Sequence, residues 1–290
     1  MALVLTAMCV PFRARHLVAA TVLAVLAVAS DQGRAVTIAA DQPSALSRAR
    51  IAYNQRRYDE AIAAAREAER IPETATPALL LVARASLERY RQSSAASDLA
   101  TARSTMASID PAKLSPGDRG EMQVGLGELL YFDDRFGAAA DMFEDAMSRV
   151  GDRGYTPRER LLGWYATSLD RQARLEAPSG RRRIYRRLLE RVARENRVGS
   201  GSAVASYWVV TATFGADDVE DAWDAAVATW VRAPLIPGGG VTLRDDIDRF
   251  VLTAIIPRRA KLASAGGETE PAADAFRKDW ASVKLTWPHR

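Results

Sequence analysis

Two stretches of the chain carry the same sparse pattern of small and aromatic residues. They are residues 126–146, LGELLYFDDRFGAAADMFEDA, and residues 49–68, ARIAYNQRRYDEAIAAAREA. In each stretch a glycine or alanine stands close to either end, and aromatic residues lie between them. Small residues at such positions allow two antiparallel helices to cross closely, with an aromatic ring filling the space beside the contact. A recurring pattern of this kind is typical of stacked helical hairpins, so it predicts an all-α fold.

The pattern recurs at spacings that can be followed along the chain. The first copy begins at Gln42 and the second at Thr76, which is 34 residues later. The third copy begins at Gly120 and the fourth at Ala203, and residues 110–118, which contain two prolines, form an extra connector before the third. The positions that match from copy to copy are Ala49, Tyr53, Tyr58, Ala61 and Ala68; Ala83, Leu87, Ala95, Leu99 and Ala102; Leu126, Gly127, Tyr131, Phe136, Ala139, Phe143 and Ala146; and Val210, Phe214, Val219, Ala222, Trp223, Trp230 and Pro234.

These positions resemble the tetratricopeptide repeat (TPR), a helix–turn–helix unit of about 34 residues. The resemblance covers residues 42–149 and, in the fourth copy, residues 203–236. It implies a right-handed superhelical array of antiparallel helix hairpins, that is, a TPR-like α-solenoid. The alternative that stays open is an all-α bundle whose alanines merely suit helix packing.

The resemblance also implies where a partner binds. In the family, the first helix of each hairpin lines a concave groove in which an extended or helical peptide docks. Carried onto the three clearer copies, the groove candidates are Arg50 and Asn54, Arg84 and Glu88, and Glu128 and Phe132. These candidates include positively charged and negatively charged side chains and one aromatic side chain, a mixture that suits a polar peptide. The assignment depends on the register, and the alternative is that these are ordinary exposed helix residues.

The remaining segments predict further helices. Residues 150–236 contain helices at 160–173 and 181–197, separated by residues 177–180, and then the fourth copy at 203–236. Whether residues 150–200 form a true repeat stays open, because the small contact residues are not at the family's positions. Residues 237–290 predict C-terminal helices that could cap the array. Thr242 and Asp245 form a capping box for one of them, and residues 272–285 form the last.

The N-terminal residues have the organisation of a secretory signal peptide. Two arginines, Arg13 and Arg15, precede an uncharged run at 17–29 that ends in small residues, as expected at a cleavage site before Ser30. Residues 1–29 are therefore predicted to be the signal and residues 30–41 a linker. The run has 13 residues, fewer than the roughly 20 that span a bilayer. Cleavage is favoured, an uncleaved anchor is the alternative, and translation from Met8 instead of Met1 stays open.

The residue inventory argues against an enzyme. The only histidines are His16 and His289, which disfavours a histidine-based triad, and the single cysteine, Cys9, lies in the signal. The same inventory predicts no metal site and no cofactor. Adjacent acids that could serve a glycosidase, but that suit turns and helix starts equally well, are Asp133 and Asp134, Asp217 and Asp218, Glu220 and Asp221, and Asp245 and Asp246. The glycines at 238–240 lack the Lys-Ser/Thr of a phosphate-binding loop.

The densest cluster of charge lies in the helix predicted at 181–197. The basic-surface candidates on it are Arg182, Arg183, Arg186 and Arg187. They could attract phospholipid headgroups or an acidic partner, or they could simply be a solvated face. Nucleic acid is not an expected partner of an exported protein, and the formal net charge of +4 indicates no particular partner.

Taken together, these features predict an exported, periplasmic, non-enzymatic scaffold or adaptor of the cell envelope that binds another protein or peptide. One alternative is a membrane-surface protein held by an uncleaved signal and the basic helix. A second alternative is a hydrolase of envelope polysaccharide, which would need two carboxylates facing each other across a cleft. The sequence does not identify the partner.

Overall fold

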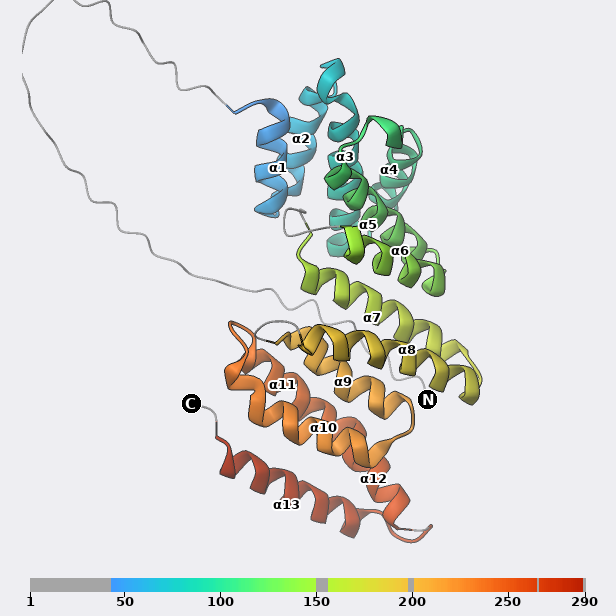
Figure 1. Cartoon of the computed structure of the whole chain (residues 1–290), viewed down its shortest axis with the longest axis vertical. Helices are drawn as coiled ribbons and strands as arrows, with labels where there is room; N and C mark the ends of the chain where they lie inside the picture. Colours follow the sequence, from blue (N-terminus) through green and yellow to red (C-terminus); the bar gives the residue numbers. More distant parts are fainter. Residues whose placement is uncertain (1–42, 150–155, 198–200, 265, 289–290) are drawn as a thin grey trace, which may run out of the picture. The chain divides into compact units, whose positions relative to one another are not determined.

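The computed structural model describes residues 43–149, 156–197, 201–264 and 266–288, and every regular element in these ranges is a helix (Figure 1). The predicted all-α class is therefore confirmed. The predicted signal at 1–29 and linker at 30–41 lie outside the described residues. None of the described helices combines the length and the apolar composition that crossing a bilayer requires.

The helices follow one another with short connections. The first eight are α1 Ala45–Asn54, α2 Tyr58–Ala68, α3 Pro72–Ser93, α4 Ala96–Ala107, α5 Pro116–Phe132, α6 Phe136–Arg149, α7 Arg158–Leu175 and α8 Pro178–Arg197. The others are α9 Ala203–Gly215, α10 Val219–Arg232, α11 Gly240–Phe250, α12 Ile256–Ala263 and α13 Glu270–Thr286. Short 3-10 turns occur at Pro111–Lys113 and Ala233–Leu235, and a π-helical segment, Val251–Ile255, joins α11 to α12.

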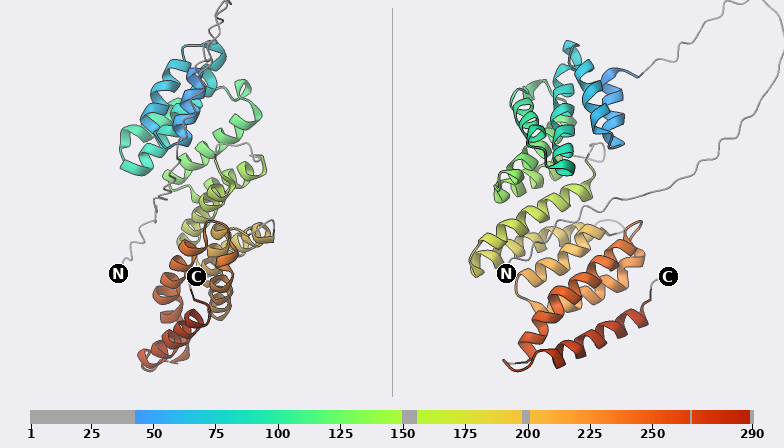
Figure 2. Two further views of the ribbon diagram at one scale, coloured as in Figure 1. Left: turned by 90° about the vertical axis from the view of Figure 1, so that its left-hand side faces the viewer. Right: turned by 180° about the vertical axis from the view of Figure 1, so that it is seen from behind.

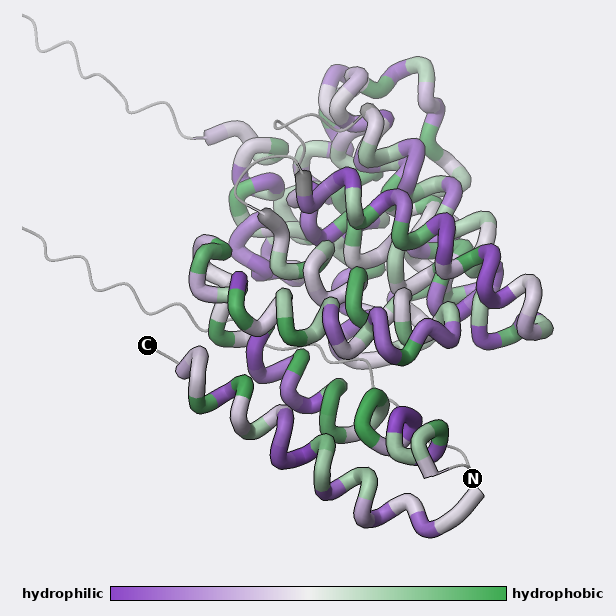
Figure 3. The backbone as a smooth tube through the Cα atoms, turned by 60° about the horizontal axis from the view of Figure 1, so that its bottom comes forward, coloured by the Kyte–Doolittle hydropathy of each residue, from purple (hydrophilic) through white to green (hydrophobic). Residues whose placement is uncertain are grey.

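Helices that are neighbours in sequence are neighbours in space. From α1 to α11, each helix packs on the next one along the chain, and each odd-numbered helix also packs on the next odd-numbered helix (Figures 1 and 2). Hydrophobic and hydrophilic residues alternate along the helices, as the colours of the α13 tube show in Figure 3, so each helix can bury one face and expose another. Five hairpins result, α1–α2, α3–α4, α5–α6, α7–α8 and α9–α10, with the odd-numbered helices sharing one face.

Three of these hairpins contain the same turn. In α1–α2, α5–α6 and α9–α10, the second residue after the first helix adopts a left-handed conformation, with φ of 61° at Arg56, 57° at Asp134 and 74° at Asp217. In all three its N–H donates to the carbonyl three residues earlier, and the next N–H donates to the carbonyl five residues earlier. This pair of bonds is the Schellman motif, which ends a helix and reverses the chain. The three turns fall at one position relative to the copies that begin at 42, 120 and 203.

The small residues predicted at the helix contacts of these hairpins are buried, whereas the aromatic residues Tyr131, Phe136 and Phe214 are half-buried. Ala49, Ala61 and Ala68 are at most 1% exposed. In the third copy, a Cβ added to Gly127 would lie 2.9 Å from a ring carbon of Phe143, so only glycine allows this crossing. Aromatic pairs close the turns of the first two such hairpins edge to face, with ring centroids 5.8 Å apart for Tyr53–Tyr58 and 5.3 Å apart for Tyr131–Phe136.

The second copy departs from the expected register. Arg56 lies 14 residues after Gln42, and the same spacing from Thr76 leads to Tyr90. The left-handed residue is instead Ser94, one helical turn later, and it makes a single bond to the carbonyl of Tyr90. The reason is the length of α3, which has 22 residues and neither glycine nor proline after Pro77 to stop it. The predicted position of this turn was therefore wrong by four residues.

Two details near the C-terminus also differ from the sequence predictions. Thr242 and Asp245 do not form a capping box, because α11 already begins at Gly240 and no side chain caps it. The chain approaches itself closely there: a Cβ on Gly240 would lie 2.3 Å from the carbonyl oxygen of Ala233. Asp245 and Asp246 consequently lie inside α11 and not at its start. The last helix, α13, buries Trp280 completely against other aromatic rings from α10.

The left-handed turns allow a test of the repeated hairpin. We expect Asp134→Val to have a free energy of unfolding about 1–2 kcal/mol lower than Asp134→Gly, because a β-branched residue is strained at positive φ whereas glycine is not. Chemical denaturation of the two variants measures this difference. The matched control is Asp145, an exposed residue inside α6, where Gly should be the less stable of the two substitutions. The same order at both sites would contradict a left-handed turn at Asp134.

Candidate protein-interaction site

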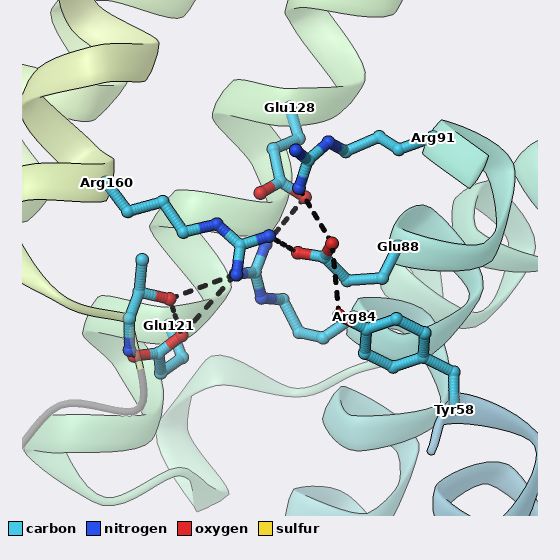
Figure 4. Close-up of polar contacts among 8 residues, drawn as sticks. Tyr58, Arg84, Glu88, Arg91, Glu121, Glu128 and Arg160 are labelled. Carbon is cyan, nitrogen blue, oxygen red and sulfur yellow. Dashed lines mark hydrogen bonds and ion pairs between the residues drawn. The ribbon is translucent and has the colours of Figure 1, made fainter. Parts of the chain in front are cut away.

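A network of charged and polar side chains lies between the helices of the first three hairpins and the start of α7 (Figure 4). We call it the Arg84 network. Its members come from α2, α3, α5, α7 and the residues just before α7, and they are Tyr58, Arg84, Glu88, Arg91, Glu121, Glu128, Thr156 and Arg160.

Arg84 is the centre of the first half of the network. Its Nη1 lies 2.7 Å from Oε2 of Glu128, and its Nη2 donates to the hydroxyl of Thr156 at 3.1 Å. Thr156 in turn donates to both carboxylate oxygens of Glu121, through its N–H and its hydroxyl, each at 2.8 Å. The start of α7 is thus tied to α3 and α5 through side chains that lie far apart in the sequence.

Glu88 is the centre of the second half. Arg91, one turn further along α3, donates to its Oε2 at 2.7 Å, and Arg160 of α7 donates to its Oε1. The hydroxyl of Tyr58 on α2 donates to Oε2 at 3.5 Å. Two arginines from different helices therefore share one carboxylate, which links α2, α3 and α7.

The Arg84 half of the network is almost completely shielded from water, whereas Arg91 and Arg160 are partly exposed. Arg84 is 2% exposed, Glu128 0% and Glu121 1%. Burial raises the pKa of Glu128 above its usual value, although the adjacent Arg84 guanidinium opposes this change. For Arg84, burial alone would lower the pKa, but the carboxylates of Glu128 and Glu121 and the nearby Tyr53 raise it well above its usual value overall. Arg84 is therefore charged at any physiological pH.

The sequence of α5 makes room for this arrangement. A Cβ on Gly125 would lie 3.1 Å from Cδ of Arg84 and 2.4 Å from Cε of Met106. Glycine at this position therefore allows the Arg84 side chain to cross α5 and reach Glu128 and Glu121. A recess between α1, α3 and α5 lies beside the network, and the buried hydroxyl of Tyr53 lines it without a hydrogen-bond partner among the described residues.

The six predicted groove residues have different fates. Arg84, Glu88 and Glu128 are buried in the network, so their side chains do not present a surface for a docking peptide. Arg50 is partly exposed and lies 3.3 Å from Asp118, and Asn54 is exposed. Phe132 is half-buried. Aligned by the left-handed turns, Glu88 and not Arg84 corresponds to Arg50 and Glu128, because the second copy is shifted by one helical turn.

An aromatic cluster lies beside Phe132 on the odd-numbered helices. The ring of Phe132 meets those of Tyr90 on α3 and Trp164 on α7 edge to face, with centroids 4.8 Å and 6.0 Å away. The guanidinium of Arg91 lies 5.1 Å from the Trp164 ring centroid. The three rings are half-buried, so they offer an apolar surface to solvent. Sequence reasoning missed Tyr90 because the expected register placed it at a turn position.

The basic-surface candidates divide into two groups. Arg182, Arg183 and Arg186 are exposed on α8, and none has an ion pair among the described residues. Arg187 differs, because it donates to Asp141 at 2.7 Å and to Glu144 at 2.6 Å on α6. Despite partial burial, these bonds raise its pKa. Arg187 therefore holds two helices together and does not belong to the free basic surface.

Arginines engage several of the acids that were considered for catalysis. Asp133 pairs with Arg103, Asp217 accepts from Arg258 at 3.0 Å, and Glu220 accepts from the Nε of Arg259 at 2.9 Å. Asp134 is the left-handed turn residue described above. These contacts give the acids structural partners in the turns where the sequence placed them.

Comparisons of the chain with protein-family models, with curated proteins and with solved structures give no match. Its function must therefore be inferred from the helices and side chains themselves.

The network predicts a large difference between buried and exposed arginines. We expect Arg84→Met to lower the free energy of unfolding by about 3–5 kcal/mol, because it leaves the buried Glu128 and Glu121 without their shared cation. Arg48→Met, which breaks an exposed pair with Glu67, should cost less than about 1 kcal/mol. Adding Glu128→Gln to Arg84→Met should recover part of the loss. Equal losses for the two single variants, measured by urea denaturation, would contradict this account.

The raised pKa of Glu128 predicts a pH dependence. The folded protein holds the carboxyl proton of Glu128 more tightly than the unfolded chain does. The contribution of Glu128 to the free energy of unfolding therefore increases as the pH falls through the pKa of the folded state toward about 4, the pKa of the unfolded state. The free energy of unfolding of the native chain, minus that of Glu128→Gln, should therefore rise as the pH is lowered from 7 to 4. Parallel denaturation series measure the difference, and a fall over that range would show that the pKa is lowered instead.

Proposed function

We propose that the protein is a non-enzymatic, protein-binding scaffold built of TPR-like helical hairpins, whose odd-numbered helices present the binding face. The observation that carries the proposal is the recurrence of one hairpin. The same two-bond, left-handed turn joins the helices of the first, third and fifth hairpins, while each odd-numbered helix packs on the next. Units that repeat in this way gain their core by stacking and leave a continuous face for a partner.

The right-handed superhelical form of the array belongs to the same proposal. Packing between consecutive helices, and between every second helix, is what stacked antiparallel hairpins require. A bundle around one central axis would also bring helices distant in sequence into contact. The packing of helix on helix in the described residues follows the chain order, with only long polar side chains reaching past a hairpin, which supports an open array.

The aromatic cluster of Tyr90, Phe132 and Trp164 is the proposed anchor for a peptide. Half-exposed aromatic rings supply contact area at low entropic cost, and such residues dominate the binding energy of many interfaces. Arg91 at the edge of the cluster, and Arg50 with Asn54 on α1, can bind polar groups of the same peptide. We therefore propose a ligand with an apolar or aromatic anchor side chain flanked by polar residues.

The location of the protein remains part of the proposal. The basic residues and the uncharged run within residues 1–29 support export to the periplasm. A scaffold or adaptor of the cell envelope would then meet its partner in that compartment.

The peptide-binding face can be tested without knowing the natural partner. Random dodecapeptides displayed on phage are selected against the immobilised full-length chain, and the affinities of the selected peptides are measured in solution. We expect Tyr90→Ala and Phe132→Ala each to weaken binding about tenfold or more, because each removes an anchor ring. Trp287→Ala, at an exposed aromatic residue after α13, is the control and should bind normally.

Thermal unfolding of each variant shows whether the fold survives the substitution. A selection that yields no binders, or binders whose affinity neither Tyr90 nor Phe132 affects, would refute the proposed face. Because Phe132→Leu retains an apolar side chain, it should keep more affinity than Phe132→Ala.

A further inference from the structure

The α7–α8 hairpin is longer than the hairpins on either side of it. Helices α7 and α8 have 18 and 20 residues, whereas α6, α9 and α10 have 14, 13 and 14. At 1.5 Å per residue, the additional residues lengthen the hairpin by several ångströms. Figure 1 shows the connection between α7 and α8 reaching beyond the adjacent helix ends. We call residues 174–183 the α7–α8 tip.

Two close contacts locate the base of this tip. Gln172 on α7 packs over Gly137, the second residue of α6, where a Cβ would lie 2.9 Å from its amide nitrogen. Tyr185 on α8 packs over Gly215, the last residue of α9, where a Cβ would lie 2.4 Å from its ring. The residues between Gln172 and Tyr185 therefore extend past the ends of both flanking helices.

The tip combines positive charge with an exposed apolar side chain. Leu175 is 75% exposed, although most leucines in the structure pack inward. The four arginines of the tip, at 174 and 181–183, are all exposed, and Glu176 is the only acid within the tip. The Glu176 side chain folds back over Gly180, since a Cβ on that glycine would lie 2.8 Å from its carboxylate oxygen. The outward surface of the tip is therefore basic with an apolar centre.

The arginines of this surface differ in their partners among the described residues, and Arg181 donates to the carbonyl oxygen of Glu176 at 3.5 Å. Arg182, Arg183 and, one turn further, Arg186 have no ion pair among the described residues. Arg174 pairs with Asp170, but half of its side chain stays exposed. Arg187 shows the contrast, since it lies closer to α6 and is bound by two carboxylates. Three free guanidinium groups thus lie on the side of α8 that faces away from its neighbours.

We propose that the α7–α8 tip docks on the surface of an anionic phospholipid bilayer. The guanidinium groups of Arg182, Arg183 and Arg186 bind headgroup phosphates, for which their planar donors are well suited. Leu175 enters the boundary between headgroups and acyl chains. The inference does not depend on the proposed peptide face, because it uses different residues at the end of the hairpin.

The shape of the tip favours a bilayer over an acidic protein. A protein partner of high affinity requires a complementary surface of considerable area, whereas this tip is a narrow projection with one isolated leucine. A bilayer needs only a protruding point with positive charge and an apolar side chain that can insert. The projection also keeps the exposed acids of α6, such as Asp141 and Asp145, behind the contact. These acids would otherwise be repelled by the anionic headgroups.

A fluorescent label within the tip tests the proposal directly. In the full-length chain carrying Cys9→Ser, Ser179→Cys introduces a single thiol at an exposed tip position, which is labelled with the environment-sensitive dye NBD. We expect vesicles of phosphatidylglycerol and phosphatidylcholine to raise the NBD intensity and shift its emission to shorter wavelength. Pure phosphatidylcholine vesicles should give little change, and 0.5 M NaCl should reverse the effect because exposed charges are screened. The local label excludes any contribution from the N-terminal apolar run.

Variants of the labelled chain separate charge from insertion. Replacing Arg182, Arg183 and Arg186 together by Gln should raise the lipid concentration at half-maximal change at least about tenfold. The control replaces three exposed arginines elsewhere, Arg56, Arg70 and Arg135, by Gln, which removes the same charge and should leave the titration almost unchanged. Leu175→Asp should reduce the spectral shift even where the chain still binds.

Three results would overturn the proposal. They are the absence of an NBD change on anionic vesicles, an equal change on phosphatidylcholine vesicles, and an equal loss in the control variant. Soluble polyglutamate serves as an acidic polymer without a bilayer. If it gives the same spectral shift as anionic vesicles, the tip recognises acidic chains in general and not a lipid surface.

Discussion

The close crossing of two antiparallel helices at a small residue is the contact on which the rest of the structure depends. At Gly127 the ring of Phe143 occupies the space that any Cβ would need, and at Ala49 and Ala61 the side chains are completely buried. Such a crossing fixes the distance between the two helices and leaves their ends close together. A tight turn can then connect them, and the left-handed residue of the Schellman motif provides that turn. The geometry of one contact therefore determines the connection and the direction in which the next helix begins.

The Arg84 network introduces a second constraint, which acts between hairpins and not within them. Apolar packing between alanine-rich helices tolerates sliding, because small side chains interlock weakly. A buried cation that must meet Glu128 and, through Thr156, Glu121 tolerates very little movement. Burying these charges costs free energy that the pairing mainly offsets, so the network contributes more to the relative positions of α3, α5 and α7 than to net stability. The Arg84 network lies beside the second copy, where the spacing of small residues departs most from the other copies. A positioning role for the network is consistent with that location.

The sequence predicted the local features well and the contacts between hairpins poorly. The helices, the buried alanines and three of the turns follow from residues within about 25 positions of one another, where spacing alone carries the information. The position of Ser94 was missed because nothing in the sequence of α3 stops the helix at Tyr90. The roles of Arg84, Glu88 and Glu128 were missed because their partners, Thr156 and Arg160, lie far along the chain. Groove positions taken from a family register are expected to be open to a ligand, but here side chains from other hairpins cover them.

The aromatic cluster and the α7–α8 tip are the two surfaces proposed for partners, and the second depends on where acids lie on the adjacent helices. Among the described residues, some arginines of α7 and α8 have carboxylates within reach on a neighbouring helix and others have no ion pair. Arg187 and Arg160 face acids and become internal links, whereas Arg182 and Arg183 lie where the flanking helices have ended, and Arg186 is exposed one turn further along α8. Because α7 and α8 are longer than their neighbours, the arginines near their connection lie beyond the acids of the adjacent helices and stay exposed. Shortening this hairpin by one turn from each helix would remove the tip and leave the core contacts at Gln172 and Tyr185 in place, so the two roles are separable along a single pair of helices.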